Sequence, residues 1–188
     1  MRAPGAALLL VVAALAFVLA GPAQAELRIS DLDVFLNDFD ITVRVVLLGT
    51  IPPTFHEGLT SGMPAHVRFT IELWQFNRLW PDRLLTTKVV ERSLAYNVVT
   101  KEYKVTPLKG ESWAPYTTRD LRDAQRVLSE VRAVKLTAST TLDATEVFYV
   151  RVRAEAALNG DTSFFARLAG TAEQTTRQSD YRTITRIQ

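Results

Sequence analysis

The stretch VFYVRVRAEAAL, residues 147–158, alternates apolar and polar side chains at every second position. Its polar positions are Tyr149, Arg151, Arg153 and Glu155. Its opposite face is apolar throughout and consists of Phe148, Val150, Val152, Ala154, Ala156 and Leu158. A period of two residues is that of a β-strand with one face buried and the other in water. The stretch therefore predicts a strand of an antiparallel sheet.

The same alternation recurs along much of the chain. In FDITVRVVLL, residues 39–48, the apolar positions are Phe39, Ile41, Val43, Val45 and Leu47. Further strand-like segments cover residues 26–36, 65–78, 84–96, 101–106 and 133–138, and a less regular one follows Thr162. Asn37-Asp38 and Asn159-Gly160 predict hairpin turns, because these residue types tolerate turn conformations. Together these signals predict a mainly β fold: an antiparallel two-sheet sandwich, Ig-like or another Greek key, of about seven or eight strands.

Two segments depart from the strand pattern and predict helices. Residues 118–132 should form a crossover helix, preceded by a capping box in which Asp120 follows Thr117 by three positions. Its apolar positions at helical spacing are Leu121, Ala124, Leu128 and Val131. Charged pairs four residues apart on this helix are Arg119 with Asp123 and Arg126 with Glu130. PPTFHEGLTSG, residues 52–62, predicts one short helix that begins near its prolines.

The segment IELWQFNRLWPDRLL, residues 71–85, contains a change of phase. Up to Leu73 the odd positions are apolar, but from Trp74 onward the aromatic residues fall on even positions. A bulge that returns Trp74 and Phe76 to the core would explain the change, with a turn at Trp80-Pro81-Asp82. An exposed ladder of Trp74, Phe76, Arg78 and Trp80 is the alternative. We predict core positions for Trp74 and Phe76 and a partly exposed pair of Arg78 and Trp80.

The N-terminus MRAPGAALLLVVAALAFVLAGPAQA, residues 1–25, has the composition of a secretory signal peptide. Cleavage after Ala25 would leave residues 26–188 as a single β-rich domain, periplasmic or otherwise exported and without a membrane span. The chain has no cysteine, so its stability must come from a core rather than from disulfides. Its 22 basic and 20 acidic residues are interspersed, which gives no indication of nucleic-acid binding.

Candidate catalytic or metal-binding groups are few. The only histidines are His56 and His66, and Ser61 does not lie in a nucleophile elbow. His56, Glu57 and His66 lack the spacing of a zinc site, and the acidic cluster departs from a calcium loop. That cluster consists of Asp31, Asp33, Asp38 and Asp40. We expect no catalytic residues, no metal and no cofactor, hence no enzyme.

A resemblance to a known family covers most of the chain after residue 25. It is carried by Gly62-Met63-Pro64 before a strand, by the Phe69 to Leu73 strand, and by Arg78 and Trp80 at its end. Leu94-Ala95-Tyr96-Asn97 and Tyr103 follow, then a helix with Ala124, Val127 and Leu128 and a strand near Tyr149. In this order the chain resembles the exported bacterial family called domain of unknown function 4390. The resemblance fades after Asn159, and it implies a single exported domain with no assigned activity.

These observations predict a non-catalytic exported domain that binds a protein or an envelope component. The candidate binding residues are Arg78, Trp80, Tyr96 and Tyr103, and the expected partner is an envelope protein rather than a nucleic acid. Two other hypotheses remain open at this stage. One is a carrier that holds an apolar ligand between its sheets, and the other is a hydrolase that uses His56 or His66. The sequence does not indicate an oligomeric state.

Overall fold

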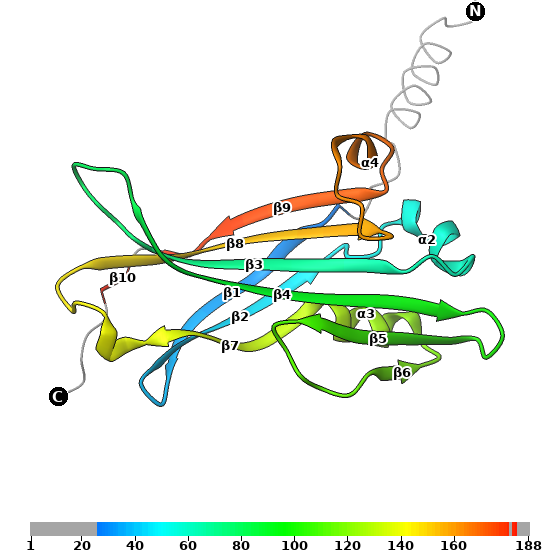
Figure 1. Cartoon of the computed structure of the whole chain (residues 1–188), viewed down its shortest axis with the longest axis horizontal. Coiled ribbons are helices and arrows are strands. Elements are labelled where there is room, and N and C mark those ends of the chain that lie inside the picture. The colour runs from blue at the N-terminus through cyan, green and yellow to red at the C-terminus, as the bar shows by residue number, and fades with distance from the viewer. Residues whose placement is uncertain (1–25, 181, 184–188) are drawn as a thin grey trace, which may run out of the picture.

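The computed structural model describes residues 26–180, 182 and 183 (Figure 1). The predicted signal peptide lies outside these residues. Among the described residues, no helix combines the length and apolar character needed to cross a membrane.

Two antiparallel sheets confirm the predicted mainly β, two-sheet architecture. The smaller sheet has the order β1-β2-β7, formed by Arg28–Asn37, Asp40–Leu48 and Glu130–Ala138. The larger sheet has the order β10-β8-β3-β4-β5-β6, and β9 also pairs with β8. Its strands are β3 (Ala65–Gln75), β4 (Arg83–Asn97), β5 (Glu102–Lys109), β6 (Tyr116–Thr118), β8 (Val147–Leu158), β9 (Ala172–Gln178) and β10 (Arg182–Thr183).

The order β8-β3-β4-β5 is that of a Greek key, because a fourth strand returns to lie beside the first of three consecutive ones. Over the described residues the larger sheet has seven strands, more than either sheet of a constant-type immunoglobulin domain, whose sheets have four and three strands. The other Greek-key description therefore fits better than the Ig-like one. In the part of the chain that the structure describes, three short helices and a 3-10 turn join the strands: α2 (Pro53–Thr60), α3 (Leu121–Ser129), α4 (Phe164–Leu168) and Ser139–Thr141.

One hydrophobic core lies between the sheets and follows the predicted alternation closely. On β8 the even positions from Phe148 to Leu158 are all buried, and on β2 the odd positions from Ile41 to Leu47 are buried. The buried face of α3 carries Ala124 and Leu128, both fully buried, as the helical spacing predicted. Burial of this apolar area, at about 25 cal/mol per Å², is the main favourable contribution to folding.

The two predicted turns differ from the structure. Asn37 pairs with Asp40, so the two-residue turn of the first hairpin is Asp38-Phe39, with φ values of 47° and 65°. Phe39 is therefore 72% exposed at the tip instead of on the buried face. Asn159 and Gly160 do have positive φ, 54° and 69°, but they do not make a tight hairpin. Helix α4 intervenes before the chain returns as β9.

The backbone of β3 does not change phase after Leu73, although the residue types do. A bulge lies at this point, but its extra residue is Leu85 on β4, because Leu73 pairs with Thr86 and Trp74 with Leu84. Strand β3 keeps an unbroken register with β8 through Gln75. Trp74 therefore stays on the outer face of the larger sheet, half-buried, and the prediction that it returns to the core is wrong.

Helix α3 is shorter than predicted and begins differently. Asp120 is its N-cap, and the side chain of Asp120 accepts a hydrogen bond from the backbone nitrogen of Arg122. The predicted pairs four residues apart do not form: Arg119 lies near Glu102 and Arg126 near Asp123. After Ser129 the chain passes directly into β7 at Glu130, without a glycine or a loop.

Candidate functional site

The loop between β3 and β4, residues 76–82, is called the tryptophan loop here. Its base is closed by the carboxylate of Asp82, which accepts hydrogen bonds from the backbone nitrogen of Asn77 at 3.1 Å and from the hydroxyl of Tyr149 at 2.7 Å. The backbone nitrogen of Phe76 donates to the carbonyl of Val147 at 2.8 Å. The loop is thus tied to β8 at its base, which limits the conformations open to its tip.

The tip of the loop places large apolar side chains in water. Leu79 is 86% exposed and Trp80 is 79% exposed, while Arg78 beside them is also exposed. Phe76 is 36% exposed, so its predicted core position is wrong. Figure 1 shows the loop extending away from the rest of the larger sheet. Arg78 and Trp80, predicted as a binding pair, therefore lie together on an accessible protrusion.

A stack of side chains supports the base of the loop from the outer face of the sheet. The rings of Trp74 and Tyr149 are nearly parallel, with centroids 6.4 Å apart and planes 6° apart. The guanidinium of Arg151 lies 4.8 Å from the centroid of the Trp74 ring, and the indole nitrogen donates to Glu72 at 2.9 Å. These contacts hold Tyr149 in position to donate to Asp82.

The electrostatics of the base favour an ionised Asp82. The hydrogen bond from the Asn77 backbone lowers the pKa of Asp82, and the Tyr149 hydroxyl and the charge of Arg151 lower it further. The carboxylate therefore keeps its charge to a lower pH than an unperturbed aspartate would.

The other two predicted binding residues lie elsewhere. Tyr96 pairs with Tyr103 across β4 and β5, with ring centroids 4.8 Å apart, and both are half-buried against the core. They sit near the C-terminal end of β4, whereas the tryptophan loop precedes its N-terminal end. Burial, Tyr96 and Asp120 raise the pKa of Tyr103. The structure thus separates the four predicted residues into two groups and does not bring them into one site.

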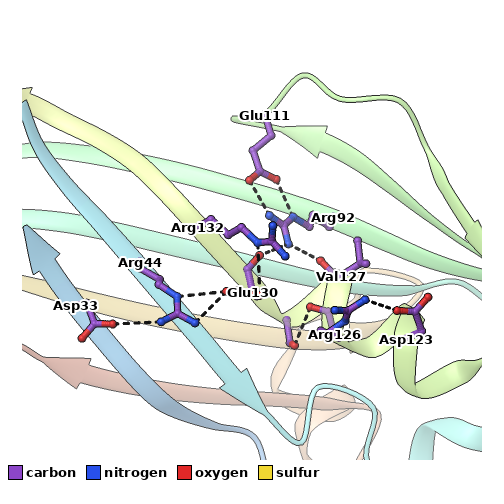
Figure 2. A network of polar contacts seen from close by, with 10 residues as sticks. Asp33, Arg44, Arg92, Glu111, Asp123, Arg126, Val127, Glu130 and Arg132 are labelled. Atoms are coloured by element: carbon purple, nitrogen blue, oxygen red, sulfur yellow. Dashed lines mark hydrogen bonds and ion pairs between the residues drawn. The ribbon is translucent and has the colours of Figure 1, made fainter. Parts of the chain in front are cut away.

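Sequence reasoning missed a buried polar network centred on Arg92 (Figure 2). Arg92 is only 4% exposed, and its guanidinium donates two hydrogen bonds to the carboxylate of Glu111, at 2.6 Å and 2.7 Å. It also donates to the backbone carbonyls of Val127 at 2.5 Å and Glu130 at 2.7 Å. These carbonyls lie where α3 ends, so Arg92 satisfies acceptors that a helix C-terminus leaves unpaired.

The surroundings of Arg92 form a groove of about 370 Å³. The Trp113 indole donates to Glu111 at 3.1 Å, and the Arg92 guanidinium lies 5.5 Å from the Trp113 ring. Burial alone would raise the pKa of Glu111, but the hydrogen bonds and charge of Arg92 outweigh it and lower that pKa. Because Arg92 and Glu111 already satisfy each other, we assign the network to the architecture and not to ligand binding.

The sequence did contain a signal for this network. On β4, Val90, Arg92 and Leu94 lie at every second position and therefore on the same buried face. Arg92 thus occupies a position at which the alternation predicts an apolar residue. A buried charge needs a partner. The adjacent Glu91 is not that partner, since Glu91 faces the other side of the sheet and pairs with Arg68 at 2.6 Å.

The remaining candidates from the sequence do not assemble into a site. His56 lies on α2 and His66 on β3, and among the described residues no three acidic, histidine or cysteine side chains are grouped to hold a metal. Partial burial lowers the pKa of His66, although Glu91 acts in the opposite direction. Of the acidic cluster, Asp33 lies 3.7 Å from Arg44, and Asp40 pairs with Lys135 at 2.7 Å.

The family model of the domain of unknown function DUF4390 matches residues 24–182. The chain therefore belongs to this family, as the order of its sequence features indicated. Comparison with curated proteins gave no match. Comparison with solved structures gave none either.

Proposed function

We propose that this domain is an exported, non-catalytic module that binds a protein or another envelope component through the tryptophan loop. The observation that carries the proposal is the exposure of Leu79 and Trp80, 86% and 79%, at the tip of a loop whose base is fixed by Asp82. Large exposed apolar side chains on a constrained loop are suited to burial in an interface.

The fixed base matters because binding costs conformational entropy. Each side chain or loop residue that is ordered only on binding reduces the affinity, by about 0.5–1.5 kcal/mol for a flexible side chain. In the tryptophan loop, Asp82 joins the Asn77 backbone to Tyr149 before any partner arrives. Tryptophan and arginine are also the residue types enriched among interface residues that contribute most to binding.

The non-catalytic part of the proposal is supported by the chemical inventory of the described residues. An acid, a base and a nucleophile must lie within hydrogen-bond reach to act together. The only two histidines of the chain lie on separate elements, and the Ser61 hydroxyl donates to the Gly58 carbonyl at 2.7 Å. The exported location is supported by the composition of residues 1–25.

Site-specific crosslinking in the native envelope tests this proposal. A photoreactive amino acid replaces Trp80 in the full chain, and the captured species is identified after irradiation. The matched control carries the same group at Val99, which is 89% exposed in the loop between β4 and β5. We expect a specific adduct from position 80 and none from position 99. Adducts of equal yield and identity at both positions would contradict a binding role for the tryptophan loop.

A second measurement separates binding from folding. Trp80→Ala should leave the thermal midpoint within about 2 °C, because exposed side chains contribute within about 0.5 kcal/mol. The same variant should lose the partner captured by the native chain. A Trp80→Ala chain that is fully stable and still retains its partner would show that another surface binds it.

A further inference from the structure

We infer that the tryptophan loop and helix α4 together seat this domain on an anionic lipid bilayer, an inference that rests on the binding role proposed above and gives it a ligand class. The two features lie at opposite ends of β8, and each presents large apolar side chains beside arginine. A bilayer surface is the partner that matches both their chemistry and their separation.

The tryptophan loop combines the residue types that favour a membrane interface. Leu79 and Trp80 are the apolar part, at 86% and 79% exposure, and Arg78 and Arg83 on either side are exposed. The one acid between them, Asp82, has both carboxylate oxygens engaged at the base of the loop. Exposed tryptophan and leucine enter the interfacial region of a bilayer, and arginine is attracted to its anionic headgroups.

Helix α4 provides a second apolar protrusion. Phe165 is 78% exposed and Leu168 is 76% exposed, and because they are three residues apart they share one face of the helix. Arg167 next to them is exposed as well, with its guanidinium donating to the Thr162 carbonyl at 2.8 Å. Ala166, 7% exposed, lies on the opposite side and packs with residues of β8 and β9.

The placement of the two protrusions favours a flat partner. Trp74, just before the tryptophan loop, pairs with Tyr149, and Ala65 at the other end of β3 pairs with Leu158, just before the segment with α4. The rise of a β-strand puts these two ends about 30 Å apart. Figure 1 shows the loop and α4 both protruding on the side of the molecule bordered by β9. A planar surface contacts both at once, whereas a single protein pocket accommodates one.

The absence of cysteine from the chain allows a direct test. Three single variants of the full chain, Leu79→Cys, Leu168→Cys and Val99→Cys, each carry one environment-sensitive fluorophore. Each is mixed with vesicles of phosphatidylglycerol or of phosphatidylcholine. The apolar run at residues 6–20 is common to all three chains. Its insertion does not require anionic lipid, so the comparison of phosphatidylglycerol with phosphatidylcholine within each chain separates its effect from that of the loop and α4. The label at position 99 is the internal control.

We expect the labels at positions 79 and 168 to shift to an apolar environment on phosphatidylglycerol, while the label at 99 stays in water. Arg78→Gln with Arg83→Gln should weaken this partition about 30-fold, since each arginine near an anionic surface contributes about fivefold. Added salt should weaken it as well. Circular dichroism and the thermal midpoint confirm that each variant is folded.

Two results would overturn the inference: labels at 79 and 168 that respond no more than the label at 99, or responses of equal size on phosphatidylcholine. If the vesicles give no response but crosslinking at position 80 captures one protein, the lipid is wrong and the binding role stands. If both experiments are silent, the proposed function fails together with this inference.

Discussion

Replacing Arg92 tests whether the buried network holds the two sheets and α3 together. Arg92→Met keeps a long side chain in place, so the loss it causes comes from hydrogen bonds and charge more than from a cavity. The change removes two hydrogen bonds to Glu111 and two to the carbonyls of Val127 and Glu130. Hydrogen bonds to charged groups contribute about 1.5–3 kcal/mol each.

The expected loss is smaller than the sum of these contributions. The Glu111 side chain is 19% exposed, so water can partly solvate its unpaired carboxylate. We expect Arg92→Met to lower the free energy of unfolding by about 3–5 kcal/mol, as for other buried pairs that lose one partner. Adding Glu111→Met should recover part of this loss, because no unpaired carboxylate then remains.

Urea denaturation followed by circular dichroism measures both changes. Arg68→Met is the matched control, because Arg68 pairs with Glu91 at 2.6 Å but is 51% exposed on the outer face of the same sheet. An exposed pair of this kind should contribute no more than about 1 kcal/mol. If Arg92→Met costs no more than Arg68→Met, the network does not stabilise the fold and our assignment of it is refuted.

Three further predictions concern the helix, the outer stack and pH. Leu128→Asp should destabilise by more than about 4 kcal/mol, because it puts a charge at a fully buried position of α3; an unchanged thermal midpoint would contradict this. Trp74→Ala should cost about 1–2 kcal/mol in urea unfolding, not the 3–5 kcal/mol of a core aromatic, because Trp74 is half-buried between Tyr149 and Arg151. The folded-state pKa of Glu111 lies below its ordinary value of 4.5, so its ionic contribution is complete above that pH and is lost as pH falls through the folded-state pKa. The stability difference between the native chain and Glu111→Gln should therefore shrink on acidification below about pH 4.5. A difference that grows instead would mean that folding raises the pKa of Glu111.

The fold class followed from the sequence because the alternation of apolar and polar residues along a strand shows which of its faces is buried. Each residue of a strand points to the opposite side from its neighbour, so β8 and β2 could be recognised without knowing what they pack against. The same reasoning placed Ala124 and Leu128 on the buried face of α3. Turn positions were less certain, since Asn37-Asp38 and Asp38-Phe39 are both plausible turns and only pairing across the hairpin decides between them.

The candidate site followed from the sequence only in part. Arg78 and Trp80 could be placed at an exposed strand end because proline and aspartate follow them. Trp74 could not be assigned, because an aromatic residue at an even position fits both a bulge that returns it to the core and an unbroken strand that carries it on the outer face. Tyr96 and Tyr103 could be identified as neighbours of a turn, but not as a half-buried pair remote from the tryptophan loop.

The sequence by itself determined which faces of the strands and of α3 are apolar, because that information is contained in residues two to four positions apart. Only the tertiary structure decided what Arg92 contacts and which protrusions share one side of the molecule. Arg92 meets Glu111 and the end of α3 from 19 and 35 residues away, and the tryptophan loop closes against Tyr149, 67 residues from Asp82. Contacts at such separations depend on how the strands and α3 pack against one another, and the periodicity of neighbouring residues does not encode that packing.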